Sequence, residues 1–551
     1  MKRFSVALLL LLALPVLSWA QGGTAKSEND PILSAMLAEL QRSKAKLKLA
    51  DVDAPYYIEY RITDVDELKL DTVFGELRLQ NRNHGRLLRV VVRVGNYKQD
   101  SYFGMGQGYV NVAVVDDDPA ALRHELWLGT DRAYKMASEA LTQKQAALKQ
   151  LNVEIQVDDF AKVPAVESLR PTVQLETASQ DWANTLSAAS ALYRRDPLLQ
   201  DFEASADFSA TNRYLVNTEG TVVRDGKALY NIHVSGTTQA ADGMHLNRGW
   251  SFVATTASEL PARPEILDQS GKVITTLKEL RDAPIVEEDY RGPVLFSPGA
   301  AENVIDNLVG NNILGRKPQP GTPARTAGAW SAEYKSRVLP EFLSVKDDPT
   351  LATFQGRTLV GSYAIDDEGI KAQIVPVIEK GKLLNFLIGR EPIRDFPESN
   401  GHGRAALGQA PEPIPGTLLI ESSEAVPREQ LKKKLIELAQ QHDLKFGYLA
   451  ESIGDDLTPL ILKRVWVSDG HEELVRGAQF GELDTRSLRS DIVAAGNDLK
   501  PSNRAESIPY SMINPSLLFD ELQVKRVDAS KDKLPEYAAP PLSATTPATT
   551  P

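Results

Sequence analysis

Apolar residues in the first half of the chain switch between the spacing of helices and that of strands. After Asp30-Pro31, a pair typical of a helix start, apolar residues from Ile32 to Leu40 recur on one helical face. From Tyr56 onward, apolar and polar residues alternate as they do in strands. We therefore expect an α+β domain in which helices pack on a mostly antiparallel sheet. The predicted helices cover 30–50, 134–151, 182–193 and 260–280, and the predicted strands 57–60, 75–80, 87–94, 202–208, 213–217, 221–224 and 229–237.

The stretch from Gly292 to Gly315 predicts a short strand, a tight corner and a helix. Val294 to Phe296 is apolar, Ser297-Pro298-Gly299 makes the corner, and apolar residues then recur at helical spacing from Val304 to Val309. Gly310-Asn311-Asn312 ends the helix, because Gly and Asn tolerate the left-handed conformation. The polar residues of this unit are gathered at one place.

The second half continues with hairpins and one amphipathic helix. Pro427 to His442 has an apolar face and a lysine-rich solvated face, and Leu460 to Arg476 predicts a hairpin. We expect a second domain, 289–528, dominated by antiparallel strands, joined to the first, 21–288, by an exposed segment from Pro284 to Glu288. Residues 529–551 are rich in Ala, Pro, Ser and Thr and predict a disordered tail.

Length, charge and cysteine content narrow the class of protein. The 551 residues are enough for two domains with a large core. A formal net charge of -12 argues against a surface built to bind nucleic acid. The chain has no Cys, which excludes both disulfides and a lipid-modified cysteine.

The N-terminus has the pattern of a cleaved secretory signal. Lys2 and Arg3 precede an apolar run from Val6 to Leu17, and Ser18-Trp19-Ala20 has small residues where a signal peptidase cuts. We predict a signal peptide over 1–20, no transmembrane segment after its removal, and a periplasmic or extracellular protein. A retained N-terminal anchor is the alternative.

Clustered carboxylates and one histidine are the candidate chemistry of the second half. Adjacent carboxylates such as Asp366, Asp367 and Glu368 shift one another's pKa, which suits acid–base catalysis. The following Gly369 favours instead the turn of a hairpin. His402 lies in a glycine-rich loop, and an exposed loop histidine is the favoured interpretation. Asp366, Asp367, Glu368, His402 and Arg404 are the candidate cleft residues.

Several segments of the second half resemble the TldD/PmbA family, described as metalloproteases and as modulators of DNA gyrase. The resemblance covers most of 290–525 and implies a TldD/PmbA-like C-terminal domain. The first half resembles the family only loosely, chiefly through Val216 to Gly220. The matching segments are Pro298 to Ala301 with the helix after it, Gly361 to Gly369, Glu379 to Leu383, Asn400 to Arg404, Val475 to Ala478 and Ala495 to Leu499.

The resemblance also locates a metal motif that this chain lacks. In the metal-binding branch of the family the same helix carries His-Glu-x-x-x-His, and here Asp306, Asn307 and Asn311 stand at those positions. A hydrolytic zinc site needs imidazole or thiolate ligands and a carboxylate as general base. Asn307 cannot take a proton, the oxygen ligands Asp306 and Asn311 suit hard cations better than zinc, and the Cys that the family implies as third ligand does not exist. We therefore predict no metal and no other cofactor.

Two interpretations of Asp306, Asn307 and Asn311 remain open. They are either polar residues of a helix end and surface, or they bind a substrate or a weakly held cation in the emptied cleft. For the whole chain, we expect an exported, metal-free, non-catalytic subunit or peptide-binding partner of a metal-bearing TldD-type paralogue, acting in proteolysis, with a homodimer as the other assembly. An active peptidase with a rebuilt site using His402 and the Asp366–Glu368 cluster, and a structural envelope protein, are the alternatives.

Overall fold

The structure is a computed structural model that describes residues 30–48, 53–151, 157–286, 289–529, 531–537 and 539–542. The predicted signal peptide and the end of the predicted tail lie outside the described residues. Within the described part, no helix is both long enough and apolar enough to cross a membrane.

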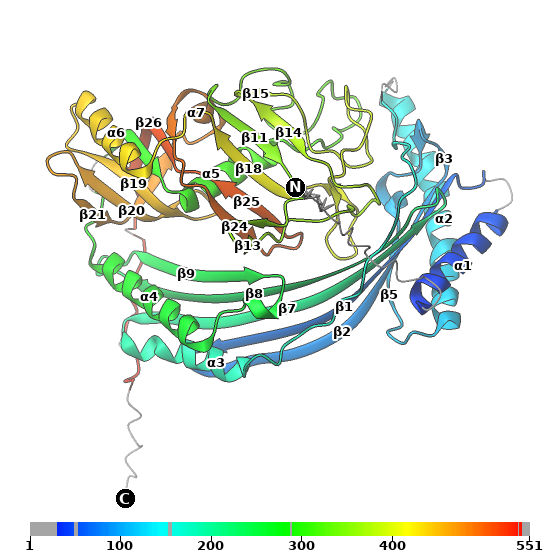
Figure 1. Ribbon diagram of the computed structural model, residues 1–551, viewed down its shortest axis with the longest axis horizontal. Helices are drawn as coiled ribbons and strands as arrows, with labels where there is room; N and C mark the ends of the chain where they lie inside the picture. Colours follow the sequence, from blue (N-terminus) through cyan, green and yellow to red (C-terminus); the bar gives the residue numbers. More distant parts are fainter. Residues whose placement is uncertain are drawn as a thin grey trace, which may run out of the picture.

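One curved sheet with four helices makes up the first half of the chain (Figure 1). The strand order is β5-β2-β1-β7-β8-β6, and β9 also pairs with β8. Only the pairing of β6 with β8 is parallel, so the prediction of helices on a mostly antiparallel sheet is confirmed. The helices are α1 (Pro31–Lys46), α2 (Pro119–Leu151), α3 (Trp182–Ser190) and α4 (Arg263–Asp282), and the strands are β1 (Tyr57–Val73), β2 (Glu76–Arg93), β5 (Tyr109–Ala113), β6 (Glu167–Leu169), β7 (Leu199–Asn217), β8 (Val222–Gln239) and β9 (His245–Ala254), with the small hairpin β3 (Gly95–Asn96) and β4 (Gln99–Asp100).

The long strands are longer than the sequence pattern predicts. Residues 75–80 and 87–94, expected as two strands, belong to the single strand β2, and β7 and β8 each merge two predicted strands in the same way. The polar stretch between them stays in the sheet because a neighbouring strand supplies partners: Arg82 pairs with Asp66 at 2.8 Å and Arg86 with Asp64 at 2.6 Å. Local periodicity carries no trace of these cross-strand pairs.

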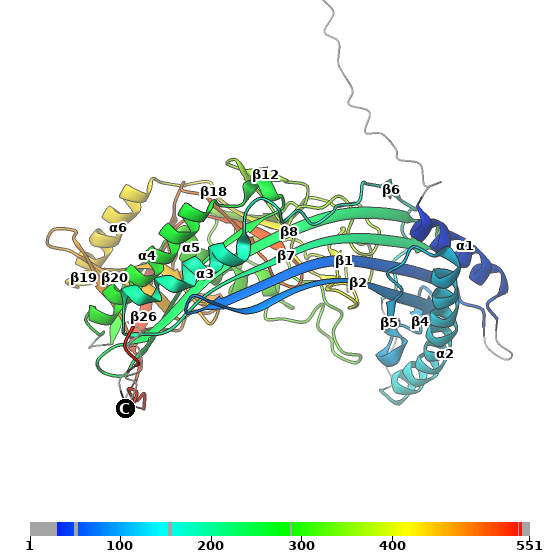
Figure 2. The same ribbon diagram turned by 90° about the horizontal axis from the view of Figure 1, so that it is seen from below.

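Opposite faces of the long strands meet different parts of the chain. Because successive side chains alternate, Phe202 and Ile232 pack toward α3 and α4, and Tyr60 and Val90 pack toward α1 and α2. Helices α3 and α4 lie near one end of the sheet and α1 and α2 at the other (Figure 2). Neighbouring positions on the other face, such as Arg213, line a cavity under the second half of the chain. The helices therefore cover one face of the sheet, and the second half covers the other.

The described residues of the second half form two large sheets with a helix between them, and two two-stranded sheets, β12-β13 and β16-β17. The strand orders of the large sheets are β21-β20-β19-β10-β26-β22, with β23 pairing β26, and β15-β14-β11-β18-β25-β24. Most pairings are antiparallel, as predicted, and the exceptions are β10 with β19 and β18 with β25. The elements are β10 (Tyr290–Phe296), α5 (Pro298–Leu308), β11 (Leu343–Asp347), β12 (Thr353–Phe354), β13 (Arg357–Thr358), β14 (Val375–Glu379), β15 (Lys382–Leu383), β16 (Gly403–Arg404), β17 (Glu412–Pro413), β18 (Thr417–Ser422), α6 (Arg428–Gln441), β19 (Phe446–Ile453), β20 (Pro459–Trp466), β21 (Glu472–Val475), β22 (Ala478–Gly481), α7 (Thr485–Ser490), β23 (Ile492–Ala495), β24 (Lys500–Arg504), β25 (Tyr510–Asn514) and β26 (Leu517–Arg526).

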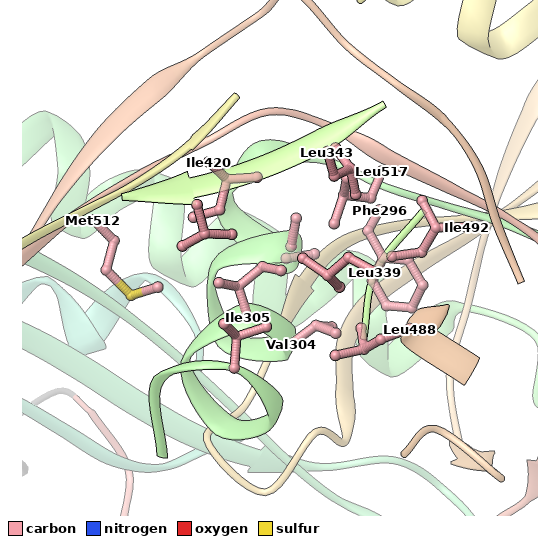
Figure 3. Close-up of a cluster of buried hydrophobic side chains, with 14 of the residues drawn as sticks. Phe296, Val304, Ile305, Leu339, Leu343, Ile420, Leu488, Ile492, Met512 and Leu517 are labelled. Atoms are coloured by element: carbon pink, nitrogen blue, oxygen red, sulfur yellow. The ribbon is translucent and has the colours of Figure 1, made fainter. Parts of the chain in front are cut away.

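Helix α5 lies in the main hydrophobic core, between these two sheets. Its Val304 and Ile305 are fully buried against Phe296 of β10 and against side chains of both sheets, including Met512 (Figure 3). The side chain of Ser297 caps the helix by accepting a hydrogen bond from the backbone N–H of Ala300. The predicted strand, corner and helix are confirmed, and the core fixes the polar face of α5 in one orientation.

The join between the two halves differs from the exposed segment that we predicted. Ala283 and Val286 are buried, and Arg476 fastens the segment. The Arg476 backbone N–H donates to Pro284 at 3.1 Å and its side chain donates to Ala283 at 3.1 Å, while Val286 donates to the Arg476 carbonyl at 3.0 Å. Of the predicted join 284–288, Pro284 is exposed, Ile285 is half-buried and Val286 is buried, because an isolated bridge pairs Ile285 with Arg476, and 287–288 lie outside the described residues.

We predict that Arg476→Ala loosens this join. The substitution removes the side-chain bonds to Ala283 and to Asp242, so thermolysin, which cuts before apolar residues, should cleave near Ile285 several times faster than in the wild type. Fragment masses identify the site. The control is Arg526→Ala, an exposed arginine of β26, and equal cleavage rates in the two variants would contradict the role of Arg476.

Candidate functional site

Two adjoining cavities lie between the curved sheet and the second half of the chain. The first, here called the sheet cavity, has a volume of about 410 Å³ and is lined by β1, β2, β7 and β8 and by residues of 362–367, 404–409 and 505–509. The second, the α5 cavity, has about 800 Å³ and is lined by the start of α5 and by residues of 250–254, 452–455 and 500–506. They share Asn231, Ala505 and Glu506, so both belong to one interdomain cleft.

The α5 cavity is walled by a charge network that the sequence did not reveal. Arg504 lies 2.6 Å from Glu302 and 3.2 Å from Asp455, and it also donates to the side chain of Asn303. Ser502 donates to the same Glu302 carboxylate at 2.8 Å. Glu302 and Asn303 are therefore both used to join α5 to β24.

The three positions of the lost metal motif serve structural roles. Asp306 accepts a hydrogen bond from the Tyr510 hydroxyl at 2.8 Å, and burial raises the pKa of its carboxyl. The Asn307 side-chain amide donates to the carbonyls of Asn303 at 2.9 Å and Asp455 at 3.0 Å. Asn311 is exposed and reaches only the Asn307 carbonyl, at 3.4 Å. These contacts favour the interpretation of Asp306, Asn307 and Asn311 as helix-end polar residues.

The residues at this place do not fit the zinc ion that the resemblance implies. The Asn307 amide is used as a double donor, and Asp306 is bound to a tyrosine hydroxyl. In the described part of the chain, no three His, Cys, Asp or Glu side chains are grouped so that they could hold a metal ion. Amide and carboxylate oxygens without imidazole or thiolate are poor zinc ligands.

The predicted turn at Asp366 to Glu368 is confirmed, but all three carboxylates are buried. Asp366 accepts hydrogen bonds from Glu368 at 3.0 Å, Ile370 at 2.8 Å and Gly403 at 3.0 Å, which closes the turn. Asp367 pairs with Arg213 of the curved sheet. Glu368 accepts from the backbone N–H of Arg390 at 2.5 Å. The cluster therefore ties the second half to the first.

His402 is fully buried, so the exposed loop histidine that we predicted is wrong. Its Nε2 lies 2.9 Å from Oδ1 of Asp347, and its Nδ1 lies 3.0 Å from the Asn400 carbonyl. Asp347 also accepts from the backbone N–H groups of Gly416 and Thr417, at 3.1 Å and 3.3 Å. With both ring nitrogens engaged in this way, His402 organises the loops behind the sheet cavity.

Two cations of the sheet cavity have an unusual environment. Arg404 donates through Nη1 to the carbonyls of Pro415 at 2.9 Å and Pro509 at 2.8 Å, and its guanidinium lies 4.8 Å from the ring centre of Tyr363. Lys227 donates to the carbonyls of Val360 and Ser362. Burial, with the nearby charges of Arg404 and Arg213, lowers the pKa of Lys227 to about 7.

The cleft therefore contains some residues that were predicted from the sequence and others that were not. Asp366, Asp367 and Arg404 line the sheet cavity, whereas Glu368 and His402 lie behind it and Asp306, Asn307 and Asn311 lie on α5. Lys227, Arg213, Glu302 and Arg504 were not predicted. A signal for Lys227 was available in the alternation along β8. The odd-numbered residues Asp225, Lys227 and Asn231 are polar and face the cavity.

We predict that Glu368→Gln changes how stability depends on pH. Burial and the charge of Asp366 raise the pKa of Glu368. The folded state then keeps a proton that the unfolded state releases above pH about 4.3. The free energy of unfolding therefore falls as pH rises through this window, with a contribution from Glu368 of up to about 1.4 kcal/mol per pH unit.

The measurement is the Tm of the variant minus that of the wild type from pH 5 to pH 9. This difference should increase with pH, because the glutamine carries no charge to bury. Glu379→Gln, at an exposed position of β14, is the matched control and should give a constant difference. A constant difference for Glu368→Gln as well would contradict the raised pKa.

Comparisons with known proteins agree on the second half and on the overall fold. Residues 289–526 match the family described as "PmbA/TldA metallopeptidase C-terminal domain". Among curated proteins, none matches the chain. The match to the family includes α5, the buried turn at Asp366 and His402, and it ends with β26.

Three solved structures share the fold at low sequence identity. A "putative modulator of a DNA gyrase" from Thermotoga maritima is 16% identical, with a TM-score of 0.57 over 89% of this chain and 99% of that chain. TldE from Thermococcus kodakarensis is 12% identical, with a TM-score of 0.57 over 89% of this chain and 99% of that chain. A "putative modulator of DNA gyrase" from Bacteroides thetaiotaomicron is 12% identical, with a TM-score of 0.57 over 91% of this chain and 100% of that chain. Residues 289–526 therefore carry the PmbA/TldA-type C-terminal domain, and the chain shares the overall fold of these three structures.

Proposed function

We propose that this chain is a metal-free, non-catalytic subunit of a TldD/PmbA-type peptidase system, which binds peptide and works with a metal-bearing partner of the same family. The observation that carries the proposal is the use of the motif positions: Asp306 and Asn307 are bonded to Tyr510 and to the 453–455 segment, not directed at a common point. A paralogue that keeps His-Glu-x-x-x-His would supply the hydrolysis.

The family supports the assembly part of this proposal. One of the structures with this fold is named TldE, and the family model that matches is that of a metallopeptidase domain. A subunit without ligands of its own keeps a cleft with a volume sufficient for a short peptide, about 410 Å³ in one cavity and 800 Å³ in the other. A homodimer remains the alternative assembly.

A peptidase with a rebuilt site is the second candidate, favoured by the raised pKa of Glu368 and of Asp366. The hydrogen bonds argue against it. Asp366 is saturated by three backbone N–H groups, and His402 is held by Asp347 and Asn400, so neither is free to activate a water molecule. We therefore propose that these residues stabilise the interdomain contact.

The first test of this proposal concerns zinc. The purified chain should contain far less than one zinc per molecule by elemental analysis and should not cleave peptides. The triple variant Asp306→His, Asn307→Glu and Asn311→His should take up zinc weakly and show little or no turnover, because it supplies only two imidazoles. Asp306→His alone is the matched control and should behave as the wild type.

Stoichiometric zinc together with chelator-sensitive cleavage by the unmodified chain would overturn the proposal. The partner is tested in the native host, where zinc should elute with this chain only in fractions that contain a second family member with the intact motif. Zinc-free fractions of this chain at the size of a dimer would favour the homodimer instead.

We also propose that the protein is exported, from the pattern of Lys2-Arg3, the apolar run and Ser18-Trp19-Ala20. Intact-mass analysis of the protein from the cell envelope fraction should give a chain that begins at Gln21. A Trp19→Arg, Ala20→Arg variant should keep the full mass, because arginine next to the cut blocks cleavage. A cytosolic wild-type species that retains Met1 would contradict export.

A further inference from the structure

Most cations of the sheet-cavity floor lie at one end, where Asp225 also lies, and two carboxylates, Glu67 and Asp207, lie at the other end, where Lys69 pairs with Glu67 at 2.8 Å. The strand register places Thr63 beside Arg213, Arg213 beside Asp225, and Thr211 beside Lys227. Further along the same strands, Glu67 lies beside Ser209, and Asp207 beside Asn231. Between the two ends, Ser209 and Thr211 carry hydroxyl groups and Val65 and Leu229 are apolar.

The distance between the two ends follows from strand geometry. Thr211 and Asp207, on the same face of β7, are about 13 Å apart at about 3.3 Å per residue. An extended peptide of about four residues has the same length. The floor thus offers a cationic end, a middle with two hydroxyl groups, and the carboxylate of Asp207 at a distance that such a ligand spans.

Three cations that line the sheet cavity, Lys227, Arg404 and Arg89, have no carboxylate partner among the described residues, and Arg89 donates to the carbonyls of Gln107 and Gly408. In the part of the chain that the structure describes, neither Lys227 nor Arg404 forms an ion pair, and both donate to backbone carbonyls instead. Two nearby carboxylates already have other partners. Asp225 pairs with Arg213 at 3.4 Å, and Asp366 accepts hydrogen bonds from the backbone. Cations that are shielded from water and lack an anion are costly to bury, which is typical of a binding site.

We propose that the sheet cavity binds the free carboxylate terminus of a short oligopeptide at Lys227 and Arg404, with the amino terminus toward Asp207. The proposal rests on the peptide-binding role proposed above and names its ligand class: zwitterionic peptides of about four residues, as peptidase products are. A single negative charge fits better than a phosphate dianion, because Asp225, Asp366, Asp367 and Glu506 line the same cavity.

Proton uptake is a built-in signature of this site. Lys227 faces the charges of Arg404, Arg213 and Asp225, together with the Tyr363 hydroxyl and Asp367, which line the same cavity. Because the pKa of Lys227 is lowered to about 7, a fraction of it is neutral at pH 7.5, and a bound carboxylate favours the charged form. Binding of an N-acetylated peptide should therefore take up protons and weaken as pH rises from 6.5 to 8.5.

The test uses the full chain after signal removal and isothermal titration with tetra-alanine. Free tetra-alanine should bind, C-terminal amidation should weaken binding about tenfold or more, and N-acetylation should weaken it less. Titrations in PIPES and in Tris, whose ionisation enthalpies differ, measure the proton uptake. Equal affinity for the acid and the amide, no binding at millimolar peptide, or tighter binding of inorganic phosphate than of tetra-alanine would overturn the proposal.

Variants separate the site from the fold. Lys227→Met should abolish the proton uptake and weaken binding about tenfold or more, while Tm stays the same or rises, since a poorly solvated cation is removed. Lys227→Arg should restore most of the affinity without proton uptake. Lys272→Met, an exposed residue of α4 whose side chain is 63% accessible, is the control and should bind as the wild type. Unchanged binding in Lys227→Met would overturn the site even if the zinc and partner measurements succeed.

Discussion

A buried guanidinium lies at the centre of the contact between the two halves of this protein. Arg390, from the second half, is fully buried, and its partners come from the first half: it donates to the Ala161 carbonyl at 2.7 Å and to Glu219 at 3.0 Å, and it stacks 3.8 Å from the ring centre of Phe160. A charge in such a place is stable only when all its partners are present. The halves therefore have to meet in one register, and the backbone of Arg390, held by Glu368, sets the position of the loops over the cleft.

The cleft is polar on both sides, because charged groups of each half meet partners from the other half there. Arg213 of the curved sheet pairs with Asp367 of the second half, and Lys227 reaches the carbonyls of the segment beside it. Each half leaves charges that the other completes, so neither half presents a finished surface by itself. The site proposed for peptide lies between these links, where Lys227 and Arg404 remain without a carboxylate.

Local patterns in the sequence predicted the elements that depend on neighbours along the chain. Helix α1 with its Asp30 cap, the strand and corner before α5, and the buried face of α6 are all confirmed. The errors concern long-range partners. The burial of His402 depends on its contact with Asp347, which is 55 residues away in sequence, and Val286 of the join is covered where Arg476 pairs with the segment. The cations of the cleft were missed for the same reason, since Lys227 becomes unusual only next to Arg404 and Arg213.

Because side chains alternate along the long strands, neighbouring residues are under different constraints. Positions such as Phe208 and Ile232 face the helices and hold the core, while Ser209 and Asn231 beside them face the cleft. A mutation at a cleft-facing position changes no packing under the helices, so the lining can drift in sequence while the fold is preserved. This arrangement lets a lineage acquire new ligand preferences without first acquiring extra stability.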